Sequence, residues 1–184
     1  DRVIIYMPMI PEAVVAMLAC ARIGAIHSVV FGGFASNELA SRIDDSKAKI
    51  LVTASCGFEP GRTVEYKPLV DEAIKIANHK IEKMILFQRP DHEVKLNAPN
   101  EVSWEEVVSN AQDADCVEMN SNELAYILYT SGTTGTPKGI VRDIGGHIVA
   151  LKWTMKNIYN IDADDIWWSA SDIGWIVGHS YIVY

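Results

Sequence analysis

The chain has 184 residues, 49% of them apolar and 22% charged, which is typical of a globular protein with a sizeable core. Its formal net charge is −8 and no segment clusters Lys and Arg, which argues against general nucleic-acid binding. No apolar run approaches the roughly eighteen residues of a membrane-spanning helix. Cys20, Cys56 and Cys116 are far apart and lack metal-ligand spacing, so we expect reduced thiols in an intracellular protein.

The first part of the chain alternates strand-like and helix-like segments. Short apolar runs predict buried strands at 3–6, 26–31, 50–53 and 83–87. Helices are predicted between them from Pro11 to Gly24, from the N-cap candidate Ser36 onward, and from Pro68 to Asn78. This βαβαβαβ order predicts an α/β fold, in which helices cover both faces of a parallel sheet.

Each predicted helix carries one apolar face, which we expect to turn toward the sheet. These faces consist of Val14, Val15, Leu18 and Ala21, then Leu39, Ala40 and Ile43, then Leu69, Ala73, Ile76 and Ala77. The connection 55–66 and the polar stretch 88–100, which has two prolines, are expected to be irregular. Ser103 begins a predicted capping box for a short helix.

The last part of the chain predicts a strand at 124–129 and another that begins at Ile140. A helix is expected at 147–159, with an apolar face of Ile148, Leu151, Met155 and Ile158. A further strand is predicted at 165–169, and a turn at 171–174 leads Trp175 into another helix.

Residues 129–139, between two predicted strands, read Tyr-Thr-Ser-Gly-Thr-Thr-Gly-Thr-Pro-Lys-Gly. Glycines let backbone N–H groups approach an anion closely, hydroxyls add donors, and Lys138 adds a full positive charge. We therefore predict a phosphate-binding loop. A flexible linker is the alternative, although linkers rarely lie so tightly between buried strands. The P-loop of nucleotide hydrolases does not fit, because Pro137 precedes Lys138, Gly139 follows it and no helix comes next.

This loop resembles the signature sequence of the adenylate-forming, AMP-binding superfamily. Residues 139–143 and 171–181 resemble the short-chain acyl-CoA synthetases of that superfamily, above all those that activate propionate and acetate. The resemblance implies a layered α/β architecture, with residues 1–184 as an internal part of the large N-terminal AMP-binding domain and without the mobile C-terminal domain. The family's ribose-binding acid, metal-binding glutamate and C-terminal lysine would then lie beyond Tyr184, so we expect the 184 residues alone to be inactive.

The implied reaction joins a short-chain carboxylate to AMP from ATP, releases pyrophosphate, and then transfers the acyl group to the thiol of coenzyme A. ATP, Mg²⁺ and coenzyme A are the implied cofactors. Neither step needs a protein nucleophile, so the lack of a Ser/His/Asp or Cys/His arrangement is expected. The implied partners are small molecules, without nucleic acid and without a membrane span. The oligomeric state stays open, as does the choice between cytoplasm and mitochondrial matrix.

The resemblance assigns roles to individual residues of the loop. The β- and γ-phosphates of ATP would be held by Thr130, Ser131, Gly132, Thr133, Thr134, Gly135 and Lys138. Thr130 and Lys138 are also the expected catalytic residues. Position 136 is often lysine in the family and is Thr136 here, which increases the expected importance of Lys138.

Trp175, Ile176 and Val177 correspond to the acyl pocket, although core packing is an alternative role for the tryptophan. Val177 replaces a threonine that is common in acetate enzymes, which favours propionate over acetate. His179 lies either near the mouth of the site or in the core.

Coenzyme A would be bound by Glu59, Pro60, Gly61, Arg62, Gly32, Gly33 and Val177. Glu59 stands where many acetate enzymes have arginine, and Arg62 could equally be an ordinary surface residue. Gly32 and Gly33 could likewise form an ordinary turn. Two other functions remain open at this point: an adenylating enzyme that transfers to a carrier-protein thiol, and a non-catalytic nucleotide-binding module.

Overall fold

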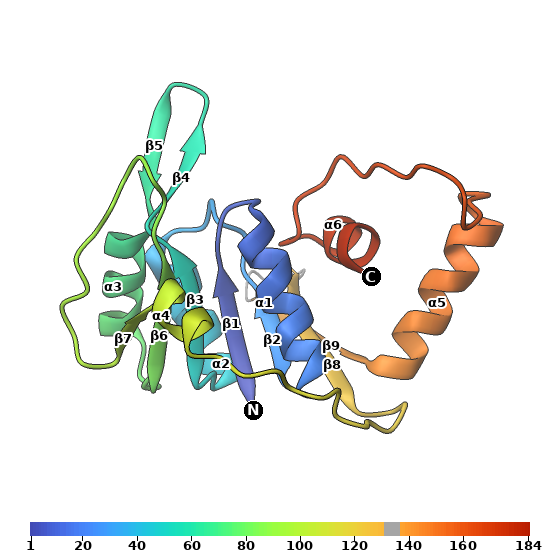
Figure 1. The fold of residues 1–184 in the computed structure, drawn as a ribbon, viewed down its shortest axis with the longest axis horizontal. Coiled ribbons are helices and arrows are strands. Elements are labelled where there is room, and N and C mark those ends of the chain that lie inside the picture. The colour runs from blue at the N-terminus through green and yellow to red at the C-terminus, as the bar shows by residue number, and fades with distance from the viewer. Residues whose placement is uncertain (131–136) are drawn as a thin grey trace.

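The computed structural model describes residues 1–130 and 137–184. Within these residues, seven strands form one sheet (Figure 1). Its strands are β1 (Arg2–Tyr6), β2 (Ile26–Val29), β3 (Ile50–Ala54), β6 (Lys83–Phe87), β7 (Glu101–Ser103), β8 (Leu124–Thr130) and β9 (Lys138–Asp143). The helices are α1 (Pro11–Arg22), α2 (Ser36–Ser46), α3 (Tyr66–Ile76), α4 (Trp104–Ser109), α5 (Ile144–Asn157) and α6 (Ile176–Gly178), and α6 continues into the π-helical turn η1 (His179–Val183).

The sheet has the strand order β7-β6-β3-β1-β2-β8-β9. All neighbouring pairs are parallel except β8 and β9, which form an antiparallel hairpin. In the part β7-β6-β3-β1-β2, the chain goes from β1 to β2 on one side and then crosses back to add β3, β6 and β7 on the other side of β1. This is the doubly wound order. The predicted α/β fold with a parallel sheet is therefore confirmed.

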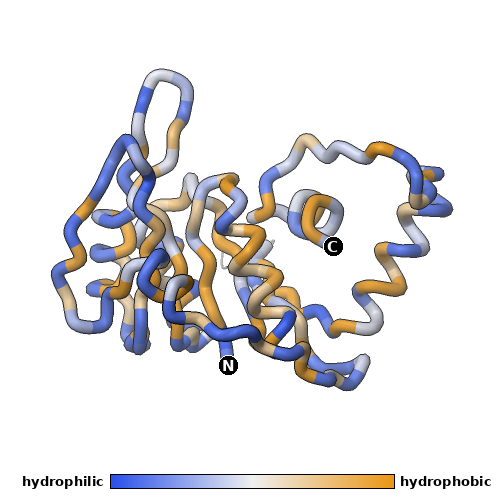
Figure 2. The backbone as a smooth tube through the Cα atoms, viewed as in Figure 1, coloured by the Kyte–Doolittle hydropathy of each residue, from blue (hydrophilic) through white to orange (hydrophobic). Residues whose placement is uncertain are grey.

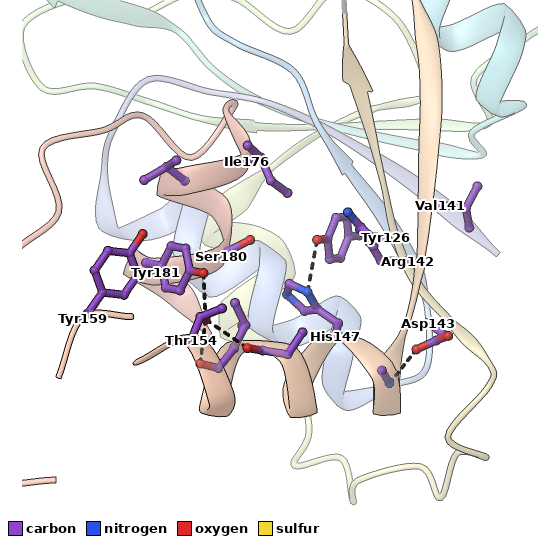
Figure 3. A pocket seen from close by; sticks show the side chains of 14 residues that line it. Tyr126, Val141, Arg142, Asp143, His147, Thr154, Tyr159, Ile176, Ser180 and Tyr181 are labelled. Carbon is purple, nitrogen blue, oxygen red and sulfur yellow. Dashed lines mark hydrogen bonds between the residues drawn. The ribbon is translucent and has the colours of Figure 1, made fainter. Parts of the chain in front are cut away.

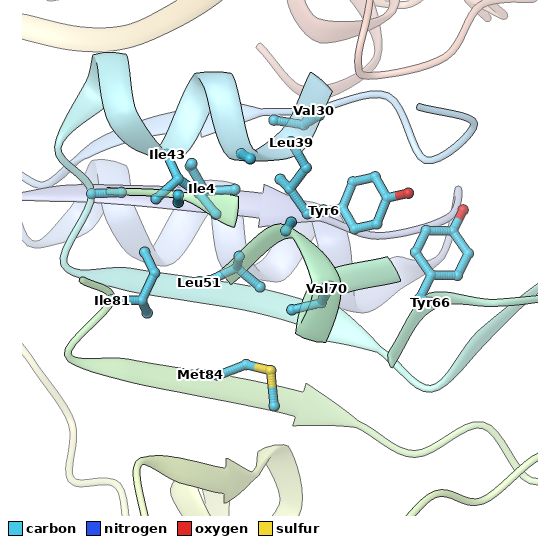
Figure 4. Packing of buried hydrophobic residues seen from close by; sticks show 14 of the residues in the cluster. Ile4, Tyr6, Val30, Leu39, Ile43, Leu51, Tyr66, Val70, Ile81 and Met84 are labelled. Atoms are coloured by element: carbon cyan, nitrogen blue, oxygen red, sulfur yellow. The ribbon is translucent and has the colours of Figure 1, made fainter. Parts of the chain in front are cut away.

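Two apolar layers cover the two faces of the sheet. Successive strand residues point to opposite faces, so Ile4 and Tyr6 of β1 pack under α2 and α3, whereas Val3 and Ile5 pack under α1 (Figure 4). From Val3 to Tyr6, β1 is buried on both sides, and these four residues are continuously apolar. Figure 2 shows the hydrophobic residues gathered along these central elements and hydrophilic residues on the outer connections.

The buried face of α1 differs from the predicted one. The helix turns Ala13, Ala16, Met17 and Cys20 toward the sheet. Val15 and Leu18 of the predicted face are 51% and 46% exposed, so that prediction is wrong. The helix has two apolar stripes, and the stripe with small residues lies against the sheet, where alanine allows a close approach.

The next two helices agree better with their predicted faces. Leu39, Ala40 and Ile43 of α2 are buried, as expected, but Ser36 is the first helical residue and makes no side-chain cap. In α3, which begins at Tyr66, residues Val70 and Ala73 are buried. Of the other predicted residues, Ala77 is buried, Leu69 is partly buried and Ile76 is exposed.

The connection 55–66 is more regular than expected. It forms a hairpin of β4 (Cys56–Glu59) and β5 (Arg62–Glu65), which projects from the sheet in Figure 1. Its two-residue turn is Pro60-Gly61, and Gly61 has a φ of +80°, which is the residue pair and the glycine conformation of a type II turn. The predicted irregular segment is therefore wrong, because the Pro60-Gly61 turn lets the residues on either side pair as strands.

The elements after β6 follow the predictions in part. Residues 88–100 are irregular apart from a bridge between Arg89 and His92, and the Oγ of Ser103 accepts a hydrogen bond from Glu106 N at 3.2 Å, which confirms the cap of α4. Residues 165–169, predicted as a strand, form none, and Ile166 and Trp168 are 98% and 82% exposed. A strand needs a hydrogen-bonding neighbour, and no strand in the described part of the chain pairs with this segment.

Candidate active site

Several of the predicted site residues lie where the parallel strands end. β1, β2, β3, β6 and β8 run in the same direction, so their carboxyl ends meet at one edge of the sheet. Ligands of open α/β sheets bind outside this edge. Thr130 ends β8, the turn 31–34 follows β2, and the hairpin β4–β5 follows β3. Three separate predicted segments therefore begin at the same edge.

The ends of β8 and β9 bring the two predicted catalytic residues together. Thr130 and Lys138 are the last register pair of this hairpin, and both are exposed. Ser131, Gly132, Thr133, Thr134 and Gly135 lie outside the described residues. In the described ranges, Lys138 makes no ion pair, so its ammonium group can meet an anionic ligand.

Trp175 lies in an aromatic cluster with the turn after β2. Its ring centroid lies 5.5 Å from that of Phe31 and 6.1 Å from that of Phe34. The chain enters this cluster through Gly174, where a Cβ would lie only 2.8 Å from the Cα of Phe31. Only glycine allows this approach. The predicted acyl segment and the predicted coenzyme A turn are thus in direct contact.

Ile176 and Val177 line a cavity of about 600 Å³, whereas Trp175 does not (Figure 3). The cavity lies between the β8–β9 hairpin, α5 and the α6–η1 segment. Its walls are mixed: the Tyr126 hydroxyl lies 3.3 Å from Nδ1 of His147, and the Thr154 hydroxyl lies 2.9 Å from that of Tyr181. Of the three residues predicted for the acyl pocket, Ile176 and Val177 therefore line the cavity, and Trp175 belongs to the aromatic cluster.

His179 lies in the core rather than at the mouth of the site. It is fully buried against His27 of β2, with the rings stacked and the two Nε2 atoms 3.1 Å apart. Burial, together with the charge of His147, lowers the pKa of His27 to about 4, and burial beside His27 lowers the pKa of His179 as well. Because burial lowers the pKa of both rings, both are neutral at pH 7, and one Nε2 then donates while the other accepts.

The residues predicted to bind coenzyme A lie in three places: Gly32 and Gly33 in the turn after β2, residues 59–62 at the tip of the β4–β5 hairpin, and Val177 in the cavity. The ring of Tyr66 lies between Gly32 and Gly57, at positions that a Cβ on either glycine would occupy. At the tip of the hairpin, Nε and Nη2 of Arg62 lie 2.7 Å and 2.6 Å from Oε2 of Glu59 and donate to it. Both side chains are exposed, and such pairs contribute only about 0–1 kcal/mol, so an anionic ligand can displace the carboxylate.

The model of the AMP-binding enzyme family matches residues 1–184, the whole of the chain. The chain belongs to this family. The AMP-binding superfamily predicted from the loop sequence is therefore confirmed.

Relatives within the AMP-binding family include proteins named as synthetases of short acyl-CoA thioesters. The acyl-CoA synthetase short-chain family member 3, mitochondrial, of Rattus norvegicus is 58% identical over 185 residues, covering 100% of this chain and 27% of the rat protein. The acetyl-coenzyme A synthetase of Pasteurella multocida (strain Pm70) is 45% identical over 186 residues, covering 100% of this chain and 28% of that protein. The chain thus spans about a quarter of the length of these relatives.

Among solved structures, the acetoacetyl-CoA synthetase from Streptomyces lividans superposes with a TM-score of 0.83. The match covers 95% of this chain and 26% of that one at 24% sequence identity. At this identity the likeness concerns the fold alone, and it supports the layered α/β architecture expected of the AMP-binding family.

The sequence prediction missed two residues that organise the site of this family member. Tyr66 closes the base of the hairpin, and Arg42 of α2 is buried beside Phe34. Arg42 could have been found, because it falls between Leu39 and Ile43 on the inward face of the helix, where a charged residue is unusual.

Residues 1–130 and 137–184 show neither a metal-binding cluster nor a membrane-spanning helix. These residues contain no group of three or more His, Cys, Asp or Glu side chains that could hold a metal ion. None of their helices combines the length and the apolar character that crossing a bilayer requires.

Proposed function

We propose that the protein containing this chain activates a short-chain carboxylate, propionate first and acetate second, as an acyl-CoA synthetase. A carboxylate oxygen attacks the α-phosphorus of ATP and pyrophosphate leaves. The thiol of coenzyme A then attacks the acyl carbon of the acyl-AMP, and AMP leaves. The reaction thus takes place inside the cell, in cytoplasm or mitochondrial matrix, where ATP and coenzyme A are substrates.

One observation carries this proposal: Thr130 and Lys138 face each other at the end of a hairpin on the carboxyl edge of the sheet. A hydroxyl donor and an exposed ammonium group suit the β- and γ-phosphates of ATP, on which negative charge increases as pyrophosphate departs. The names of the rat and bacterial relatives, at 58% and 45% identity, supply the acyl and coenzyme A parts of the proposal.

Mg²⁺ enters the reaction as part of the Mg–ATP substrate. The described residues offer no cluster of acidic side chains for a resident ion. Mg²⁺ retains several waters and is commonly held by the substrate's phosphates with one or two carboxylates, so a dedicated cage is not needed.

The acyl group is assigned to the cavity lined by Ile176 and Val177, next to the Trp175 cluster. The apolar Val177 favours the longer alkyl group of propionate over that of acetate. Coenzyme A is assigned to the neighbouring turn at Gly32 and Gly33 and to residues 59–62 of the hairpin, where Arg62 would exchange the Glu59 carboxylate for a phosphate.

The test is carboxylate-dependent exchange between ATP and pyrophosphate, in the protein encoded by the full reading frame of this chain. Lys138→Ala is expected to lower the exchange rate by about 10²- to 10³-fold, the effect of removing one preorganised charge-stabilising group. Lys95→Ala is the matched control, because Lys95 is an exposed lysine of the irregular segment 88–100 and should leave the rate unchanged. Measurable ATP binding without exchange for any acid would instead support a nucleotide-binding module.

A further inference from the structure

Helix α2 holds Tyr129, the residue that precedes Thr130. The Tyr129 hydroxyl donates a hydrogen bond of 2.6 Å to Oδ2 of Asp45. On the same helix, the guanidinium carbon of Arg42 lies 5.3 Å from the centroid of the Tyr129 ring. The two α2 residues are three positions apart and therefore share one side of the helix. They hold the tyrosine by its hydroxyl and by its ring face.

Arg42 itself is fixed in place. It is 4% exposed, and its Nη1 donates to the backbone carbonyl of Glu38 at 2.6 Å and to Oε2 of that residue at 2.8 Å. Its guanidinium carbon also lies 4.6 Å from the ring centroid of Phe34, in the turn after β2. A buried arginine is costly unless its charge is paired, and here it contacts aromatic rings of two site segments.

The other side of Tyr129 lies against β9. Tyr129 and Gly139 are register partners, and a Cβ on Gly139 would lie 3.2 Å from Cε1 of the tyrosine ring. The ring therefore packs closely against Gly139, and a side chain there would press on it. Thr130 and Lys138 form the next register pair, so any displacement of Tyr129 moves both of them.

We propose that Asp45 and Arg42 are positioning residues for ATP, acting through Tyr129. They fix the β8–β9 hairpin so that Thr130 and Lys138 meet the phosphates without further rearrangement, which lowers the entropic cost of binding. This inference rests on the proposed role of Thr130 and Lys138 as phosphate ligands, and it adds residues that never touch the nucleotide.

Asp44 provides a matched control on the same helix. Its carboxylate accepts hydrogen bonds from the backbone N of His79 at 2.7 Å and from Nδ2 of Asn78 at 3.1 Å. Asp44 therefore ties α2 to the end of α3 instead of to Tyr129. Replacing it removes a comparable set of hydrogen bonds without affecting the hairpin.

The experiment measures the Kd of ATP by equilibrium titration and the KM of ATP in pyrophosphate exchange, in the protein encoded by the full reading frame. Tyr129→Phe and Asp45→Ala are each expected to raise both constants about fivefold, as one hydrogen bond is lost. The double variant should be no worse than either single variant, because both changes remove the same bond. Asp44→Ala should leave both constants within about twofold, even though it lowers the melting temperature.

Arg42 is tested by a conservative pair. Arg42→Met should raise the Kd of ATP, and Arg42→Lys should restore part of the loss because it keeps the charge over the ring. Circular dichroism restricts the comparison to folded variants, and Tyr129→Phe is the change least able to disturb folding.

Three results would overturn the inference: an unchanged Kd of ATP in folded Tyr129→Phe, additive effects in the double variant, or an equal effect of Asp44→Ala. Failure of the proposed function has a different signature, namely no carboxylate-dependent exchange in the unaltered protein. The Kd of ATP still decides the positioning role in that case.

Discussion

Two regions of the molecule differ in how far they bury their apolar residues. The first region is the sheet with α1, α2 and α3, and the second is the segment from α5 to Tyr184. In the first region, Ile4, Ile5, Leu39 and Leu51 are fully buried. In the second region, α5 buries only Leu151, while Val149 is 69% exposed. Figure 1 shows why: α1 lies over the sheet, whereas α5 lies beyond it, past β8 and β9.

The difference teaches that an apolar stripe predicts burial only when another layer lies opposite it. In the first region, one stripe of each of α1, α2 and α3 meets a strand face, and the second stripe of α1, with Val15 and Leu18, has no layer opposite it and is exposed. The stripe of α5 meets the cavity at Leu151 and otherwise faces outward, so Ile148 and Ile158 of the predicted face are exposed. The hydrophobic term follows the area removed from water and not the pattern in the sequence.

The largest expected effect separates the two regions directly. Leu51→Ala should destabilise the chain by about 2–5 kcal/mol, because a buried leucine is replaced by a cavity. Val149→Ala, on the exposed side of α5, should change stability by less than about 0.5 kcal/mol. Urea unfolding followed by circular dichroism measures both. Similar losses of stability in the two variants would show that Val149 is buried in solution and would remove the contrast.

The fold of the first region was predictable because its strands are continuous apolar runs between turn signals. The choice of face in α1 was not, because Val15 and Leu18 form a stripe as apolar as the buried one, and only packing against the sheet decides between them. The strand predicted at 165–169 failed for a related reason: Ile166 and Trp168 have strand-like residue types, but pairing depends on a neighbour that a local pattern does not report.

The candidate site was predictable where its residues are close in sequence. Thr130 and Lys138 belong to one loop motif, and the structure pairs them across a hairpin. The contact of Trp175 with Phe31 joins segments more than 140 residues apart and could not be read from either. The same holds for the contact of Arg42 with Tyr129, which crosses from a helix to a distant strand.

The second largest effect concerns the histidine pair that joins the two regions, His27 in β2 and His179 in η1. The rings of Tyr126 and Tyr184 lie against both histidines, and His147 packs in turn on Tyr126 and Tyr184. The folded state lowers the pKa of His27 to about 4, so the unfolded chain, in which the histidine pKa is about 6.5, binds protons first as pH falls. The contribution of the buried histidine to the free energy of unfolding is therefore fully present above about pH 6.5. Below that pH it decreases by about 1.4 kcal/mol per pH unit for each proton taken up.

Urea midpoints between pH 7.5 and 4.5 measure this dependence. The variant His179→Leu should have a shallower slope, because one buried titrating ring is gone, while Val149→Ala, which removes no titrating group, should keep the slope of the unaltered chain. An unchanged slope in His179→Leu would mean that burial of His179 against His27 does not contribute to the pH dependence of stability.

The smallest effect tests whether the second region contributes to specificity even where it contributes little to stability. Val177 is half-exposed and lines the cavity, so Val177→Thr should leave the urea midpoint nearly unchanged. In the proposed reaction, a hydroxyl in place of a methyl group makes the pocket more polar, which should shift the acetate-to-propionate ratio of kcat/KM toward acetate by about tenfold or less. Val149→Thr, on the exposed side of α5, should not shift it. A ratio that stays constant in Val177→Thr, while the unaltered protein still discriminates between the acids, would move the source of specificity from the cavity to the Trp175 cluster.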